Sequence, residues 1–228
     1  MKEIELGKMI VDYSIYPRAS VDSQQISYLR EADDAGAELP PIVVEKGTNR
    51  IVDGVHRHKM WLRKYDDKHK VPVIEKRYEN EGELLLDAIR LNAPHGRMLD
   101  SHDKTHCIIL AEKLHIPESE LASALSITVD KVGKLRLGRI GELHIGKTVN
   151  AVALKNTIRH MNGRILTKEQ SDANNQLGGM NQIFYVNQII LLLDNNLVDW
   201  GNENLIAKMA ILRERLNNCL KMKKAKSG

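Results

Sequence analysis

Apolar residues have two different spacings in the first hundred residues of this chain. Where they recur every three or four positions, they predict helices over residues 22–36, 56–67 and 81–93. Where they are β-branched and contiguous, they predict strands over residues 40–46, 51–53 and 70–78. The letters GTNR between the first two strands predict a tight turn and therefore a hairpin. An α+β domain follows from this order of elements.

After about residue 100 the strand pattern largely stops and only helical periodicity remains. It predicts helices over residues 103–115, 118–126, 128–137, 167–177, 183–196 and 204–224. The glycines and short polar segments of residues 138–150 predict a connector. We therefore expect three parts: an α+β domain over 1–100, a helical DNA-binding domain over 101–140, and a helical region over 141–228 that packs on itself or dimerises.

The helices expected over 118–126 and 128–137 have the apolar spacing of a pair that crosses closely. Leu121 and Leu125 line the first helix, Val132 and Leu135 line the second, and the turn falls at residues 126–128. This arrangement resembles the helix-turn-helix motif of DNA-binding proteins, although Ser126 stands where that turn commonly has glycine. The resemblance directs five side chains toward a major groove: Thr128, Asp130, Lys131, Lys134 and Arg136. A helical hairpin with a solvated charged face is the alternative.

Two further basic residues are candidates for contacts to a DNA backbone. Lys155 and Arg159 lie four residues apart, so they share one face if their segment is helical. A solvated helix face is the alternative here too.

The stretch IVDGVHRHKMW, residues 51–61, passes from a strand to a helix through a glycine. Gly54 permits close approach of a ligand to the backbone, and the following helix start offers unpaired N–H groups to an anion. Arg57 can bind phosphate through two hydrogen bonds, and His56 can add a donor. His56 and His58 are two residues apart and cannot share one helical face, so we predict no metal site here.

The order of these segments resembles the ParB family of partition proteins across roughly residues 10–137. In that family a proline-arginine segment, a Gly-x-x-Arg element and an Asn-x-x-Arg element form a nucleotide pocket, and a helix-turn-helix domain follows. This chain has His95 where the last element has arginine, with Gly96 and Arg97 just beyond. The resemblance implies nucleotide contacts at eight residues: Arg18, Gly54, His56, Arg57, Asn92, His95, Gly96 and Arg97. It implies CTP or another nucleotide with Mg²⁺ as the cofactor.

Two other branches of the same fold suggest enzymatic alternatives. Sulfiredoxins carry a catalytic cysteine in this element, and Val55 occupies that position here, which excludes their chemistry. A kinase of free serine has a similar Asp-Gly-x-x-Arg segment, so a nucleotide-dependent kinase, a nuclease or a weak triphosphatase remains an alternative. The nearby carboxylates that such an enzyme could use have no recognisable catalytic spacing: Glu31, Asp33, Asp34 and Asp53.

Amino-acid composition indicates the cellular compartment and the kind of partner, but it does not identify a reaction. The formal net charge of +4 is compatible with an anionic partner, and the 4% aromatic content supplies little for base stacking. Cys107 and Cys219 form no disulfide or metal-binding pattern, which favours a reducing compartment, and no apolar run could span a bilayer. The last predicted helix carries one apolar stripe suited to a core or a dimer seam: Leu205, Met209, Leu212, Leu216 and Leu220.

These observations lead to one functional hypothesis. We expect a cytoplasmic ParB-type protein that binds double-stranded DNA and responds to a nucleotide. Its role would be partition, together with a partition ATPase, or transcriptional regulation of a plasmid, phage or mobile element. The last helix allows either an intramolecular core or a homodimer, and a membrane partner is not expected.

Overall fold

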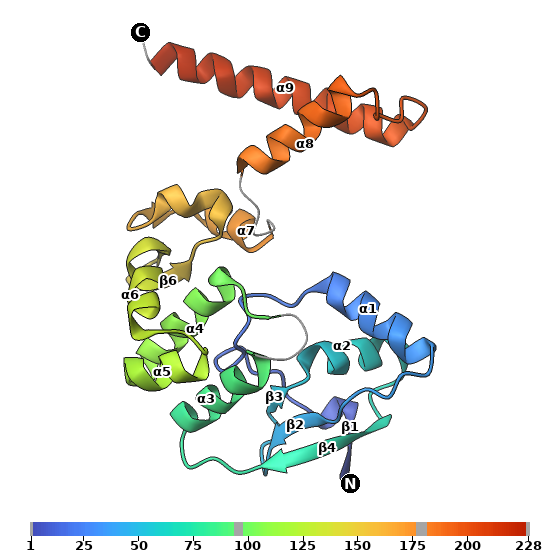
Figure 1. Cartoon of the computed structure of the whole chain (residues 1–228), viewed down its shortest axis with the longest axis vertical. Coiled ribbons are helices and arrows are strands. Elements are labelled where there is room, and N and C mark those ends of the chain that lie inside the picture. The colour runs from blue at the N-terminus through green and yellow to red at the C-terminus, as the bar shows by residue number, and fades with distance from the viewer. Residues whose placement is uncertain (1, 94–97, 177–181, 227–228) are drawn as a thin grey trace. The chain divides into compact units, whose positions relative to one another are not determined.

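The computed structural model describes residues 2–93, 98–176 and 182–226 (Figure 1). The chain forms two compact units, Met1–Met180 and Asn181–Gly228. Helices and two small sheets share the first unit, so the predicted mixed α+β class is confirmed. The finer division at residues 100 and 140 stays a prediction.

The first sheet has four strands in the order β1–β4–β2–β3. These strands are β1 (Lys2–Glu5), β2 (Ile42–Glu45), β3 (Ile51–Asp53) and β4 (Lys70–Lys76). The predicted hairpin is present, because β2 pairs antiparallel with β3, whereas β4 runs parallel to β2 and antiparallel to β1. Strand β1 was not predicted, since three of its four residues are charged and its stability comes from pairing with β4.

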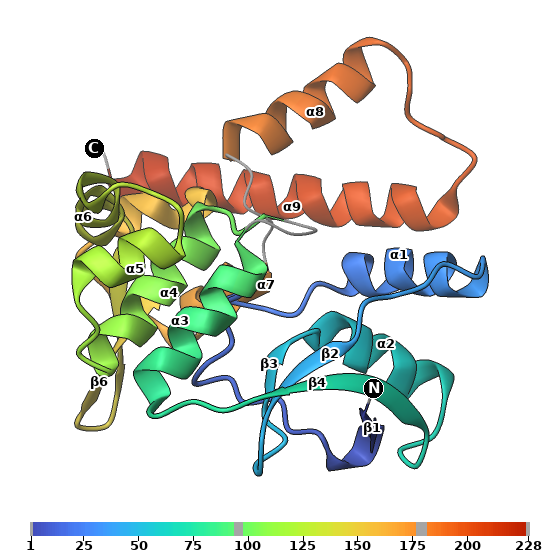
Figure 2. The same cartoon turned by 60° about the horizontal axis from the view of Figure 1, so that its bottom comes forward.

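Helices cover both faces of this sheet. They are α1 (Ser23–Asp34), α2 (Val55–Lys64) and α3 (Glu81–Asn92). Helices α1 and α2 lie together over one face (Figure 2), where Ile42 and Val44 pack with Met60 of α2. Val43 points to the other face and packs with Val52 and with Leu84 of α3. Burial on both faces explains why β2 is a continuous apolar run.

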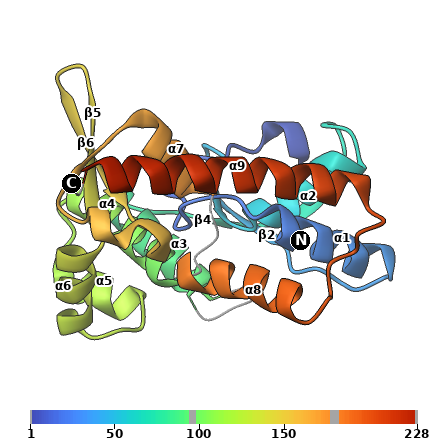
Figure 3. The same ribbon diagram turned by 90° about the horizontal axis from the view of Figure 1, so that it is seen from above.

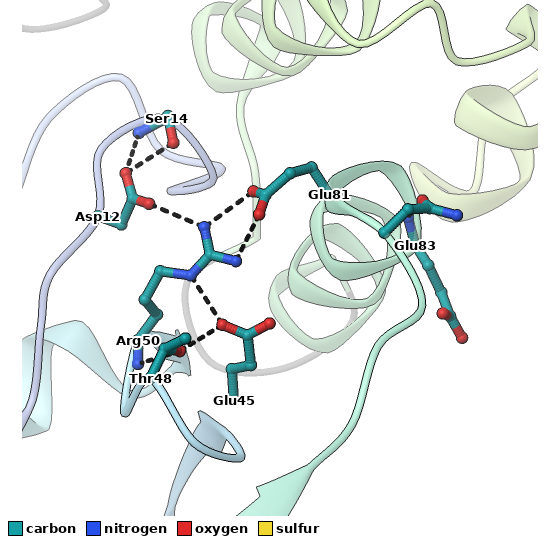
Figure 4. A network of polar contacts seen from close by, with 8 residues as sticks. Asp12, Ser14, Glu45, Thr48, Arg50, Glu81 and Glu83 are labelled. Carbon is teal, nitrogen blue, oxygen red and sulfur yellow. Dashed lines mark hydrogen bonds and ion pairs between the residues drawn. The ribbon is translucent and has the colours of Figure 1, made fainter.

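A single guanidinium group ties three segments around the sheet together (Figure 4). Arg50, which follows the β2–β3 turn, donates to both carboxylate oxygens of Glu81 at 2.8 and 2.6 Å. It also donates to Glu45 at 2.8 Å and to Asp12 at 3.2 Å. The hydrogen bond from Arg50 lowers the pKa of Glu45, so this cluster stabilises the fold above the ordinary pKa of a carboxyl and weakens at lower pH.

The middle of the chain forms three helices around a second core. They are α4 (Ser101–Lys113), α5 (Glu118–Ala124) and α6 (Val129–Gly138). Leu121 and Leu125 of the first predicted helix pack with Val132 and Leu135 of the second, as expected. Ile108 of α4 lies in the same cluster, so α4 is the support on which the helix pair rests.

The prediction that strands end near residue 100 is wrong. Residues 140–153 form a hairpin of β5 (Ile140–Ile145) and β6 (Thr148–Ala153), and β7 (Ile165–Leu166) pairs with β5. The expected connector is this hairpin, whose two-residue turn starts at Gly146 with φ +60°. Figure 3 shows it projecting beyond the helices of its unit. Between β6 and β7 lies a short 3₁₀ helix, Asn156–Met161, and α7 (Lys168–Gln176) follows.

The second unit contains α8 (Gln182–Asp194) and α9 (Glu203–Lys226). No residue of α8 is buried, although its sequence is strongly apolar. Along the predicted stripe of α9, Met209 and Leu212 are half-buried and Leu216 and Leu220 are exposed. The stripe therefore does not form a closed core within the described residues. Among those residues there is no helix with the length and apolar character needed to cross a membrane.

Candidate functional site

The strand-to-helix passage around Gly54 has the geometry expected of a close backbone approach. Gly54 is the N-cap of α2 and has φ +104°, a conformation that side chains disfavour. A Cβ atom there would lie 2.8 Å from Nη2 of Arg57 and 3.1 Å from Ile42. Asp53 does not cap the helix; its carboxylate accepts a hydrogen bond from Arg57 at 2.8 Å. Arg57 is thus folded back over the glycine.

The segment Tyr16–Ala19 lies against α4 and contacts two of its successive turns, at Asp103 and at Cys107. The guanidinium of Arg18 is 3.6 Å from the carboxylate of Asp103, which also accepts the Ala19 N–H at 3.1 Å. One turn later, the Cys107 thiol donates to the Pro17 carbonyl at 3.1 Å. Arg18 and Asp103 are both nearly fully buried, so this ion pair fixes the position of the segment.

These two structures form the walls of one pocket of about 260 Å³. Five of the eight predicted nucleotide-binding residues line it: Arg18, Gly54, His56, Arg57 and Asn92. The remaining three, His95, Gly96 and Arg97, lie outside the described residues. Tyr16, Leu29, Pro40 and Val52 supply an apolar wall, which the sequence did not identify as part of the site.

The polar groups of the pocket suit an anion. His56 accepts the Asp22 N–H through Nε2 at 3.1 Å, which leaves its Nδ1 to carry the proton of the neutral ring. The Nε atom of Arg57 is buried and has no hydrogen-bond partner among the described residues. Together with the start of α2, these donors could hold a phosphate or carboxylate group. The pocket is slightly smaller than the roughly 300–1,000 Å³ of most small-molecule sites.

The carboxylates considered for catalysis do not gather in this pocket. Asp33 and Asp34 bind Lys64 of α2, and the pocket is lined by Asp53 alone of the four candidates. Its oxygen is already bound to Arg57. Nothing in this arrangement among the described residues resembles a pair of carboxylates holding a metal for phosphoryl transfer.

A separate group of possible metal ligands lies at the start of α4. One oxygen or nitrogen atom from each of Asp100, His102 and Asp103 lies within 4.8 Å of the others. These atoms already have structural partners, because Asp100 and Asp103 form a capping box and His102 bonds to the Ala153 carbonyl. Burial lowers the pKa of His102 to about 4, which keeps this imidazole neutral at neutral pH.

The helix pair has a well-defined turn. Ser126, which follows the C-cap of α5, lies in the left-handed region at φ +54°, and the Ile127 N–H donates to the Ala122 carbonyl at 3.0 Å. The serine therefore adopts the conformation that glycine usually supplies. Thr128 caps α6 by accepting the Lys131 N–H at 3.2 Å.

Most of the predicted DNA-contacting side chains of α6 are exposed. Asp130, Lys131 and Lys134 face solvent, and Lys134 forms an exposed ion pair with Asp130 at 2.6 Å. Arg136 instead turns toward neighbouring helices and binds Glu112 of α4 and Glu118 of α5. It serves to hold the three helices together.

The prediction that Lys155 and Arg159 share a helical face is wrong. Lys155 precedes the 3₁₀ helix, and its ammonium group donates to the Asn175 carbonyl at 2.9 Å while its stem is buried. Arg159 is exposed but donates to the Gly138 carbonyl at the end of α6. Both side chains are therefore occupied with local structure.

The sequence did not identify Asp103 as the residue that holds Arg18 in position. The pattern Asp-x-x-Asp at residues 100–103 signals a helix start, and the capping box confirms it. The same signal says nothing of Arg18, which lies 85 positions earlier in the chain. Only the folded structure brings the two together.

Comparison with known proteins gives partial matches. The chain is 28% identical to the transcriptional regulator NovG of Streptomyces niveus over 139 residues, which is 59% of this chain and 41% of that protein. It is 29% identical over 133 residues (56% of this chain and 37% of the relative) to a possible regulatory protein of the streptomycin biosynthesis operon in Streptomyces griseus. The chain thus spans less than half the length of either relative. No protein-family model matches the sequence.

The solved structures similar to this chain include the truncated chromosome-partitioning protein ParB of Caulobacter crescentus. Its complex with the centromeric parS site has a TM-score of 0.42 and 18% identity, covering 60% of this chain and 71% of that one. Its complex with CTP-γ-S has a TM-score of 0.36 and 17% identity, covering 60% and 77%. ParB is therefore among the structures that this chain resembles, as its motifs predict.

Proposed function

We propose that this chain is a ParB-like regulatory protein of the cytoplasm that binds double-stranded DNA through α5 and α6. The observation that carries the proposal is the outward face of α6. Lys131 and Lys134 are exposed there, on a helix whose other side is fixed by Val132 and Leu135 in the core. A rigid helix that presents lysines is suited to contact phosphates and guanine edges of a major groove. Arg136 and Lys155 are not part of the proposed surface.

Of the two roles expected from the sequence, we propose transcriptional regulation. Both curated relatives are named as regulators, one of them of an antibiotic biosynthesis operon. The DNA site is unknown, so it must be selected from a random duplex library with the full chain.

Binding to the selected duplex tests the proposal. Lys131→Ala and Lys134→Ala should each weaken binding at all sequences and reduce the slope of log affinity against log salt concentration by about 1. Lys68→Ala, which removes an exposed lysine from the loop before β4, is the matched control and should bind as wild type. Wild-type binding by both α6 variants would show that another surface contacts DNA.

We further propose that the pocket at Gly54 holds the phosphate of a nucleotide such as CTP, with or without Mg²⁺. The donors of Arg18, His56 and Arg57, which all line the pocket, and the start of α2 support this assignment. Titration of the purified chain with CTP, ATP and inorganic phosphate, with and without Mg²⁺ and the selected duplex, tests it. Turnover without DNA would favour the enzymatic alternative, whereas the regulator should show binding that changes when the duplex is added.

We also propose that the second unit forms a homodimer. Its exposed apolar side chains are spread over both helices, among them Ile190 and Leu193 of α8 and Ile206 and Leu216 of α9. A surface of this kind in a water-exposed helix pair favours burial against another chain. Sedimentation of the full chain at micromolar concentration should give a dimer, and a monomer there would contradict the proposal.

A further inference from the structure

Gly133 occupies the middle of α6 without a structural reason to be glycine. Its φ does not lie in the left-handed region, so alanine could adopt the same backbone conformation. A Cβ atom built at this position meets nothing within 4 Å. Glycine nevertheless destabilises a helix interior relative to alanine. The fold of the described residues therefore gains nothing from the absence of a side chain at position 133.

The side of α6 that carries Gly133 is also unusually apolar for a solvent-facing surface. Val129 and Leu137 lie one turn before and one turn after the glycine, since positions four apart share a helical face. Val129 is 47% exposed and Leu137 is 79% exposed, the highest value among the large apolar side chains described. Together these three residues form a strip, here called the apolar strip of α6.

Two lysines of the same helix lie to one side of this strip. Lys134 directly follows the glycine, Lys131 lies farther round the helix in the same direction, and Asp130, the ion-pair partner of Lys134, lies between Lys134 and the strip. A partner that covers the strip must therefore accept positive charge along one side of it while offering apolar groups at its centre. A DNA major groove has both, because phosphates line its walls and each thymine presents a C5-methyl group on its floor. A protein surface would need acidic residues along that same side of a narrow apolar ridge.

We propose that Val129, Gly133 and Leu137 read thymine methyl groups in the DNA site, and that Gly133 admits the closest approach of α6 to the bases. This inference rests on the proposed binding of duplex DNA through α6, and adds the chemistry of base recognition to it. In this arrangement the lysines position the helix along the backbone, and the strip provides sequence preference.

The test uses the full chain and the duplex selected from a random library. Each thymine of that duplex is replaced in turn by uracil, which lacks only the methyl group. Wild type should lose about fourfold in affinity at one or more of these positions, the value expected for one buried methyl group. Val129→Ala or Leu137→Ala should abolish the sensitivity at the position that its side chain contacts. Ile74→Ala, which shortens an exposed apolar side chain of β4, is the control and should retain the wild-type sensitivity to uracil at every position.

Gly133→Ala supplies a second, independent readout. Its melting temperature should rise by about 2–4 °C, because alanine is the better helix former and meets no clash. Its affinity for the duplex should fall at least about fivefold, because the new methyl group stands between helix and bases. Wild-type affinity of Gly133→Ala, a selected site without thymine, or no effect of uracil at any position would each overturn the inference while leaving DNA binding intact. Failure to select any duplex, or full binding by Lys131→Ala and Lys134→Ala, would instead refute the proposed function on which the inference rests.

Discussion

Replacing a glycine of left-handed conformation by alanine can destabilise the fold in two ways, through backbone strain and through steric contact of the new Cβ atom. Comparing Gly54→Ala with Gly47→Ala separates the two. Gly54 and Gly47 have almost the same φ, +104° and +100°, but Gly47 has nothing within 4 Å of its added Cβ. At Gly47 an alanine should cost about 1–2 kcal/mol, the penalty for a left-handed side-chain-bearing residue. At Gly54 the contacts with Arg57 at 2.8 Å and Ile42 at 3.1 Å should add about 1–3 kcal/mol.

Urea unfolding measures the difference directly. The chain has two tryptophans, and a Trp200→Phe background leaves Trp61, buried in α2, to report on the first unit. The midpoint should fall further for Gly54→Ala than for Gly47→Ala, by roughly 0.5–1.5 M if m is about 2 kcal/mol/M. In an Arg57→Ala background the extra loss should shrink, and the part due to Ile42 should remain. Equal midpoints for the two alanine variants would refute the idea that Gly54 is required for close packing of Arg57.

Two further predictions concern the helical part. Ser126→Gly should stabilise the protein by about 0.5–1 kcal/mol, because Ser126 has a left-handed conformation at φ +54° that glycine adopts without strain. Thermal unfolding measures this change, and an unchanged or lower midpoint would contradict the prediction. Burial lowers the pKa of His102 to about 4, so its contribution to stability is fully present above the ordinary value near 6.5 and is lost as pH falls through 4. His102→Gln should therefore reduce the loss of stability between pH 6.5 and 4 by about 1–3 kcal/mol in chemical unfolding, and an unchanged pH profile would refute the assignment.

Local sequence patterns predicted those elements whose stability is local. The apolar run at residues 42–44 and the spacing of Leu121, Leu125 and Val132 each correspond to an observed strand or helix. The left-handed conformation of Ser126 could also be expected, because the motif has glycine there. These signals depend on residues within a few positions of one another.

Elements fixed by distant contacts were missed. The hairpin of β5 and β6 contains glycine and short polar stretches, and its root is held by hydrogen bonds from His102 and Asn174 to the Ala153 carbonyl. No local pattern carries that information. The convergence of Arg18 and Arg57 on one pocket was predicted only from the order of motifs in a related family, and the role of Asp103 not at all.

The attachment of Tyr16–Ala19 to α4 has a consequence for how the chain can be divided. A fragment that stops before Ser101 would retain the complete sheet of β1–β4, yet the guanidinium of Arg18 would lose the carboxylate that holds it. Such a fragment would fold with one wall of its cavity unanchored. The pocket at Gly54 therefore depends on α4 for the position of one of its walls, although no residue of α4 lines it.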